Sequence, residues 1–193
     1  MPHGAPREEP KMSERLDLLQ TFARYNAHAN RHMFTVLRRP EVESRINDKI
    51  EGYFDSIGAI LNHLLLADRA WLNRIRGVWG SLDAFKGRPE SEWGAPKDIF
   101  AAPFEKLEEI ESQQEIADQF LLDLAVAAGP AVEGGKVPEK VSYTDSKGNA
   151  VEIPAEGALL HLFNHHTHHR GQISQILDEM GIENDFSGLR QIL

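Results

Sequence analysis

Five of the nine histidines in this chain lie within the segment HLFNHHTHHRGQ at 161–172. The segment is internal and is flanked by apolar residues at helical spacing, so it differs from an affinity tag, which sits at a terminus. Successive residues of an α-helix turn by about 100°, so His161, His165 and His169 would share one face. Imidazoles one turn apart can bind a single metal ion, as they do in helical zinc motifs.

Another histidine, His63, lies in the apolar segment ILNHLLLADRAWL at 60–72. In a helix, small residues on the same face would leave a recess for an imidazole and a bound ligand. These small residues are Ser56, Ala59, Ala67 and Ala70. Burying several imidazoles without a metal requires a hydrogen-bond partner for every ring nitrogen. Spacing alone leaves two interpretations open: a metal site shared by two helices, or histidines that are exposed or hydrogen-bonded without an ion.

Three polar residues, Asn30, Asp68 and Gln172, could orient water or support the ligands from behind. Asp68 would lie about 140° from His63 around a helix, so we do not include it among the catalytic candidates. A different pair, His28 and His32, also has i, i+4 spacing, but it falls opposite the apolar face of its helix. We therefore expect these two histidines in solvent, without a role.

Several other chemistries lack their sequence patterns. The absence of cysteine excludes disulfides, thiolate metal sites and a catalytic thiol. There is no HExxH motif of zincins, no Glu-x-x-His pair of di-iron bundles and no glycine-rich nucleotide motif. The formal net charge of −9 argues against binding a nucleic-acid backbone. No apolar run approaches the roughly 20 residues that span a bilayer, so we expect a cytoplasmic protein.

The elements that must position the histidines are predicted to be helices. Apolar periodicity predicts four of them, at about 13–37, 53–78, 104–128 and 154–180. Alternation around a Gly-Asn turn predicts a β-hairpin at 140–153, directly before the last helix. The long connection 79–102 is either a functional loop or a packed surface excursion. We predict an all-α four-helix bundle as a single domain over 13–193, after a disordered lead at 1–12.

At this point the sequence resembles the DinB superfamily of bacterial metal-binding bundles, also called DinB/YfiT-like. The motifs that carry the resemblance are YNAHAN at 25–30, NHLLLADRAWL at 62–72, the hairpin and HLFNHHTHHRGQ at 161–172. The resemblance implies a four-helix bundle with a long crossover, which is often a homodimer. It also implies a metal site formed by His63, His165 and His169, with His161 as a nearby residue or rival ligand.

The resemblance implies less about the reaction. The best-understood activity in the DinB superfamily is thiol transfer, and many of its members have no assigned reaction. Three neutral imidazoles with open positions are typical of a catalytic metal site. Imidazole suits zinc and nickel, so we expect one divalent ion of either kind. Our first hypothesis is a metal-dependent enzyme, a hydrolase or thiol transferase, acting on a small molecule. The alternatives are a non-catalytic stress-response protein with a structural ion, or an interaction module with a vestigial metal.

Overall fold

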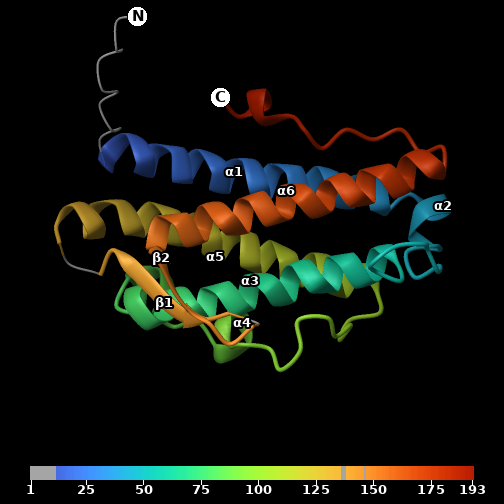
Figure 1. Ribbon diagram of the computed structural model, residues 1–193. Coiled ribbons are helices and arrows are strands. Elements are labelled where there is room, and N and C mark those ends of the chain that lie inside the picture. Colours follow the sequence, from blue (N-terminus) through green and yellow to red (C-terminus); the bar gives the residue numbers. More distant parts are fainter. Residues whose placement is uncertain (1–11, 136–137, 146) are drawn as a thin grey trace, which may run out of the picture.

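A computed structural model describes residues 12–135, 138–145 and 147–193 of the chain (Figure 1). Four long helices lie side by side, α1 (Met12–Leu37), α3 (Ile57–Trp79), α5 (Leu107–Glu133) and α6 (Ala155–Glu179). Helix α1 packs on α5 and α6, and α3 packs on the same two helices. The consecutive helices α1 and α3 therefore occupy opposite corners, and the chain between them crosses one end of the bundle. The predicted four-helix bundle with a crossover is confirmed.

The core consists of two apolar clusters that are separated by a layer of buried polar residues. One cluster lies toward the hairpin end of the bundle and includes Trp71, Phe120 and Leu162. The other lies toward the crossover end and includes Phe34, Ile60 and Leu177. The buried polar residues between them come from all four helices, and they are Asn26, Asn30, His63, Asp68, Gln114, Asp118, His166, His169 and Arg170. The bundle thus places its polar chemistry in one central layer.

Helix α3 begins at Ile57, four residues later than predicted. Ser56 is in extended conformation, and its side chain accepts a hydrogen bond from the backbone amide of Ala59 at 3.0 Å. This contact is an N-cap, which satisfies an amide that has no partner within the helix. The preceding Tyr53 is 78% exposed and lies in the crossover, which includes the short helix α2 (Pro40–Glu43).

Helix α5 continues past Pro130 to Glu133, so the prediction that this helix ends near residue 128, before Gly129-Pro130, is wrong. Pro130 lacks an amide hydrogen and cannot bond the carbonyl of Val126. Val126 is 57% exposed, so water can replace that bond. Two buried residues beyond the proline, Ala131 and Val132, pack in the core and favour one further helical turn.

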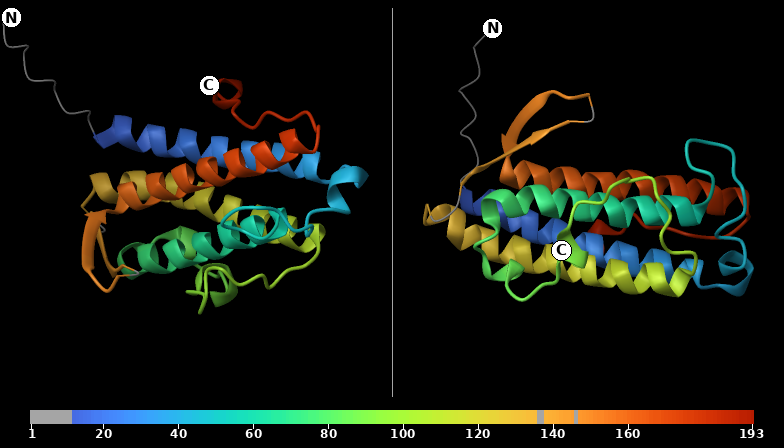
Figure 2. Two further views of the ribbon diagram at one scale, coloured as in Figure 1. Left: turned by 45° about the vertical axis from the view of Figure 1, so that its right-hand side comes forward. Right: turned by 90° about the horizontal axis from the view of Figure 1, so that it is seen from below.

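The predicted β-hairpin is confirmed in the part of this segment that the structure describes. Strand β1 (Lys140–Thr144) pairs antiparallel with β2 (Ala150–Pro154), and Tyr143 lies opposite Val151. Pro154 ends β2 and directly precedes α6, whereas we had predicted it as the first residue of that helix. The hairpin contacts α3 and α6 near the beginning of α6 and projects outward from the bundle (Figure 2).

The connection between α3 and α5 contains two short helices, η1 (Asp83–Phe85) and α4 (Glu90–Trp93). Its second part runs back along α3 (Figures 1 and 2). Asn62 of α3 holds this part in place, because its side chain donates to the carbonyl of Phe104 at 2.8 Å and accepts from the Phe104 amide at 3.1 Å. The long connection is therefore fixed next to the helix that carries His63.

The C-terminal segment 180–193 runs back along α1 and includes the short helix η2 (Leu189–Gln191). It covers the side of α1 where His28 and His32 lie. The His28 ring is 2.9 Å from the Gln191 side chain, and the His32 ring meets Phe186 edge-on at 6.0 Å. His32 is exposed, as we expected, whereas His28 is half-buried where the C-terminal segment packs on it.

The expected lead at 1–12 lies outside the described residues, apart from Met12, where α1 begins. The extent of the single domain, 13–193, stays a prediction. Among the described helices, none is both long and apolar enough to cross a membrane.

Candidate metal centre

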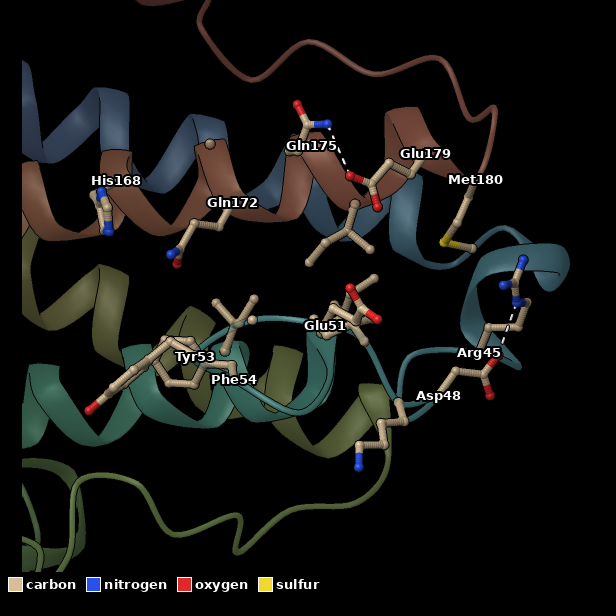
Figure 3. A pocket seen from close by; sticks show the side chains of 17 residues that line it. Arg45, Asp48, Glu51, Tyr53, Phe54, His168, Gln172, Gln175, Glu179 and Met180 are labelled. Atoms are coloured by element: carbon tan, nitrogen blue, oxygen red, sulfur yellow. Dashed lines mark hydrogen bonds and ion pairs between the residues drawn. The ribbon is translucent and has the colours of Figure 1, made fainter.

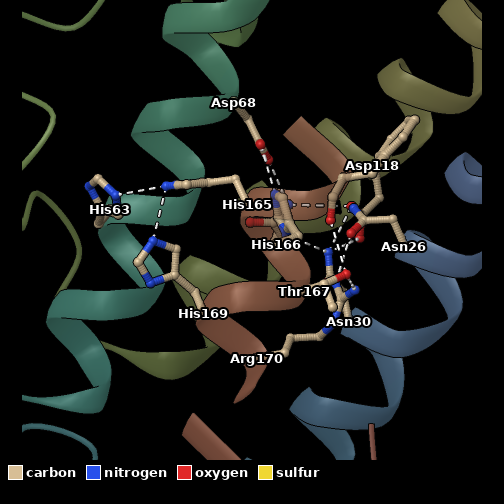
Figure 4. A network of polar contacts seen from close by, with 12 residues as sticks. Asn26, Asn30, His63, Asp68, Asp118, His165, His166, Thr167, His169 and Arg170 are labelled. Atoms are coloured by element: carbon tan, nitrogen blue, oxygen red, sulfur yellow. Dashed lines mark hydrogen bonds and ion pairs between the residues drawn. The ribbon is translucent and has the colours of Figure 1, made fainter. Parts of the chain in front are cut away.

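Three histidine side chains meet at the seam between α3 and α6 (Figure 4). The Nε2 atom of His165 is 3.2 Å from Nε2 of His63 and 3.0 Å from Nε2 of His169. One ligand atom from each ring lies within 4.8 Å of the others, so the group could hold a metal ion. Two ligands come from successive turns of α6, and the third comes from the helix that packs against it.

Two of the three rings are held from behind through their other nitrogen. The Nδ1 atom of His63 is 2.9 Å from the carbonyl oxygen of Ile99, which can only accept. The Nδ1 atom of His169 is 2.6 Å from the side-chain oxygen of Gln172. The Ile99 carbonyl requires the His63 proton on Nδ1, and Gln172, with its oxygen toward the ring, accepts the proton from Nδ1 of His169; each Nε2 then has a free lone pair. Both lone pairs point at Nε2 of His165, whose single proton could satisfy only one of them.

The electrostatic setting keeps these rings neutral. Burial lowers the pKa of His63, and burial with the neighbouring histidines lowers the pKa of His165 to about 3 and of His169 to about 4. A buried imidazole loses solvation when it is charged, and a second imidazolium nearby adds repulsion. At neutral pH the cluster therefore offers neutral nitrogen ligands to a cation.

Aromatic rings cover the centre on the side of the crossover and the long connection. Phe100 stacks on His63 with ring centroids 5.1 Å apart, and Phe54 lies 5.0 Å from the His63 ring and 5.4 Å from the His169 ring. His63 and His169 are 6% and 5% exposed, whereas His165 is only half-buried. The cover is thus apolar on one side, and the centre reaches solvent beside His165.

The other candidates of the sequence analysis lie at different distances from this centre. His161 is exposed and packs on Trp71, with its ring 6.3 Å from the ring of His165 and outside the three-histidine group. Gln172 supports a ligand from behind, in the position that we considered for it. Asp68 instead contacts His166 at 2.7 Å and does not reach the three-histidine group.

A second polar cluster adjoins the centre and was not assembled from the sequence (Figure 4). Its Asp118 accepts from the amides of Asn26 at 3.1 Å and Asn30 at 2.9 Å. The guanidinium of Arg170 donates to the amide oxygens of the same two asparagines at 2.7 and 2.8 Å. Burial raises the pKa of Asp118 to about 6. The available signal was the inward position of Asn26, Asn30 and Gln114 in otherwise apolar helix faces.

A groove of about 1120 Å³ lies between residues 45–57 and the second half of α6 (Figure 3). It shares Phe54 and Gln172 with the histidine centre, and Ile60 and Ile176 form part of its apolar lining. The three histidines themselves do not line it. The groove therefore borders the centre behind the aromatic cover.

The donor set fits a divalent transition metal. Three neutral imidazoles suit zinc or nickel, and the group contains no carboxylate that would favour magnesium or calcium. No fourth histidine or acidic ligand joins it among the described residues. Three protein ligands with a remaining position are the pattern of catalytic rather than closed structural zinc sites.

The sequence matches the model of the DinB family over residues 12–186. That range includes all four long helices, the hairpin and the three histidines. Among curated proteins, none matches the chain.

Proposed function

The chain belongs to the DinB family, and we propose that it binds one divalent metal ion, zinc or nickel, through His63, His165 and His169. We further propose that the ion serves a reaction on a small molecule, either hydrolysis or transfer of a thiol. The observation that carries this proposal is the convergence of three Nε2 atoms within 4.8 Å, with two of the rings fixed from behind.

The bound ion would act as a Lewis acid that lowers the pKa of a water molecule or of a substrate thiol. The residues of the protein orient the imidazoles and exclude water from the centre. Gln172 and the carbonyl of Ile99 hold two imidazoles in the tautomer that presents Nε2. Phe54 and Phe100 exclude water from one side of the centre, which strengthens electrostatic interactions inside it.

A catalytic role is supported over a purely structural one by two features. A structural ion has a closed shell of four protein ligands, and only three residues form this group among those described. The fold also has apolar core on both sides of the polar layer, so helices α3 and α6 pack together without relying on an ion. The enzyme hypothesis therefore ranks above a non-catalytic stress-response protein.

Chelation followed by thermal unfolding separates the two roles. An ion that is needed for the fold would make the metal-free protein unfold at a much lower temperature or lose its helical circular dichroism. We expect the metal-free protein to keep its helical spectrum and lose turnover of small esters or thiol-transfer substrates, and to regain turnover with zinc or nickel. Loss of the fold on chelation would support the structural role instead.

We also propose that the protein is a homodimer, as its family resemblance implies. Exposed apolar side chains on α1 and α5 supply surface for such contacts, among them Leu18 at 54% and Val126 at 57% exposure. Light scattering coupled to gel filtration would measure the mass directly. A mass of one chain, about 21.7 kDa, across micromolar concentrations would refute the dimer.

A further inference from the structure

Arg74 lies on the same face of α3 as His63, three helical turns further along. Eleven residues separate the two positions, which corresponds to about 16 Å along the helix axis. The Arg74 guanidinium lies 4.4 Å from the ring of Trp71 and 4.5 Å from the ring of Tyr143 in strand β1. The two ring contacts hold the guanidinium at a fixed place between α3 and the hairpin.

No hydrogen bond or ion pair satisfies the N–H edge of Arg74 among the described residues. Arg88 makes an informative contrast, because its guanidinium lies 4.2 Å from the Phe120 ring but also donates to Glu92 at 2.8 Å and Asp123 at 2.6 Å. Stacking on a ring therefore leaves the N–H edge free to bind carboxylates. The chain has 30 acidic residues against 21 basic ones, yet no acidic partner contacts half-buried Arg74 in the described structure.

The surroundings of Arg74 add further donors. Trp71 is 8% exposed, and its indole N–H makes no hydrogen bond to any residue that the structure describes. The indole N–H therefore remains a second possible donor on a ring that the guanidinium contacts at 4.4 Å. Burial lowers the pKa of Arg74, because the cation gives up solvation without gaining a carboxylate. An incoming oxyanion would restore both the charge balance and the hydrogen bonds.

A continuous row of rings connects this cation to the histidine centre. The Trp71 ring lies 4.9 Å from the ring of His161, and His161 stacks at 6.3 Å on the metal-ligand candidate His165. His161 is exposed and His165 is half-buried, so this is the side on which the centre reaches solvent. A molecule lying along this row would contact the centre at one end and Arg74 at the other.

We propose that the N–H edge of Arg74, together with Trp71 and His161, binds the oxyanion end of an extended small substrate whose opposite end reaches the histidine centre. The oxyanion is a carboxylate or a phosphate, since the guanidinium fork fits both. The link to the centre rests on the proposed function, whereas oxyanion binding at Arg74 does not.

The first test uses metal-free, ¹⁵N-labelled protein, so it is independent of the metal. Acetate and inorganic phosphate are titrated at constant ionic strength while NMR follows the Arg74 Nε–H and Trp71 indole signals. We expect a saturable shift that Arg74→Gln abolishes. The matched control is Arg76→Gln, because Arg76 also stacks on a tryptophan, Trp93 at 4.0 Å, but is exposed. Whichever of acetate and phosphate has the lower Kd shows whether the site prefers a carboxylate or a phosphate. The absence of a saturable shift with both anions would overturn the proposal.

The second test asks whether one molecule can bind the metal centre and Arg74 at the same time. Calorimetry on nickel- or zinc-loaded protein would compare α,ω-dicarboxylates from succinate to dodecanedioate, in which one carboxylate can reach the metal and the other Arg74. We expect an affinity maximum at a chain longer than succinate, at least tenfold weaker in Arg74→Gln and unchanged in Arg76→Gln. Equal affinities for all chain lengths would overturn the link to the centre.

Arg74 also packs against the hairpin, so the glutamine variant must keep the wild-type circular dichroism. If it does not fold, Arg74→Lys replaces it in both tests, because lysine keeps the charge but lacks the planar fork. We expect the lysine variant to bind acetate and phosphate several-fold more weakly than wild type. Binding by the lysine variant as tight as that of the wild type would contradict recognition by the guanidinium.

Discussion

The Nε2 atoms of His63 and His165 lie 3.2 Å apart, although 102 positions separate these residues in the sequence. A carbonyl bond at Nδ1 leaves His63 with a lone pair directed at its neighbour. Because His169 also directs a lone pair at His165, one proton cannot satisfy the three nitrogens, whereas one divalent cation can. This relationship links the fold to a metal-binding function.

Replacing Gln172 with alanine is expected to weaken metal binding by about 10- to 100-fold, as loss of an outer hydrogen-bond partner does in other metal sites. The cause is the loss of the 2.6 Å contact that fixes the His169 ring. Competition with a coloured chelator would measure the affinity. Gln175→Ala is the matched control, because Gln175 lies on the same helix, is exposed, and among the described residues its side chain hydrogen-bonds to Glu179 rather than to a histidine. Equal losses in both variants would remove Gln172 from this role.

The metal-free protein is expected to lose stability as pH falls below about 6.5. Unfolded histidines take up protons near that pH, whereas folded His169 does so near 4 and folded His165 near 3. The unfolded state therefore binds more protons between about pH 6.5 and 4, which lowers the free energy of unfolding by at most about 1.4 kcal/mol per pH unit for each histidine.

Urea unfolding from pH 8 to 4.5 would measure this dependence. The double variant His165→Gln, His169→Gln lacks both titrating groups and should show a shallower decline than the wild type. Identical slopes in the two proteins would show that other groups dominate the pH dependence.

The structure explains why the three-histidine group could be predicted from the sequence and the buried polar cluster could not. His165 and His169 share a helix, so their relation follows from the period of one element. The contact between Asp68 and His166 depends on how α3 and α6 pack, since 98 positions separate the residues. The spacing of Asp68 and His63 placed them on different sides of one helix, which is consistent with the structure. Spacing within one helix does not show which side of a second helix faces it.

The ends of the helices also depend on tertiary packing, which the sequence pattern of one helix does not predict. Ser56 could be recognised as an N-cap only once its own backbone was known to be extended. The continuation of α5 beyond Pro130 depends on the burial of Ala131 and Val132 by other elements, which overrides the local tendency of Gly129-Pro130 to end a helix. Local signals located the elements, and tertiary packing set their ends.

Asp68→Ala is expected to destabilise the fold by about 3–5 kcal/mol, the typical cost of removing one partner from a buried pair. Asp68 and His166 are both fully buried and 2.7 Å apart. Asp48→Ala removes a carboxylate from the exposed Asp48–Arg45 pair and should cost less than about 1 kcal/mol. Chemical denaturation of both variants would give the values, and a similar small cost for both would contradict the importance of the buried pair.

The most direct test of the central claim is the metal content of untagged protein, measured by mass spectrometry after supplementation with zinc or nickel. We predict about one ion per chain in wild type and a marked loss in His63→Ala, His165→Ala and His169→Ala, with the helical spectrum retained. His161→Ala and His168→Ala serve as controls, because both histidines are exposed and outside the group; they should keep the ion. A wild-type protein without bound metal, or equal metal content in all five variants, would contradict the claim.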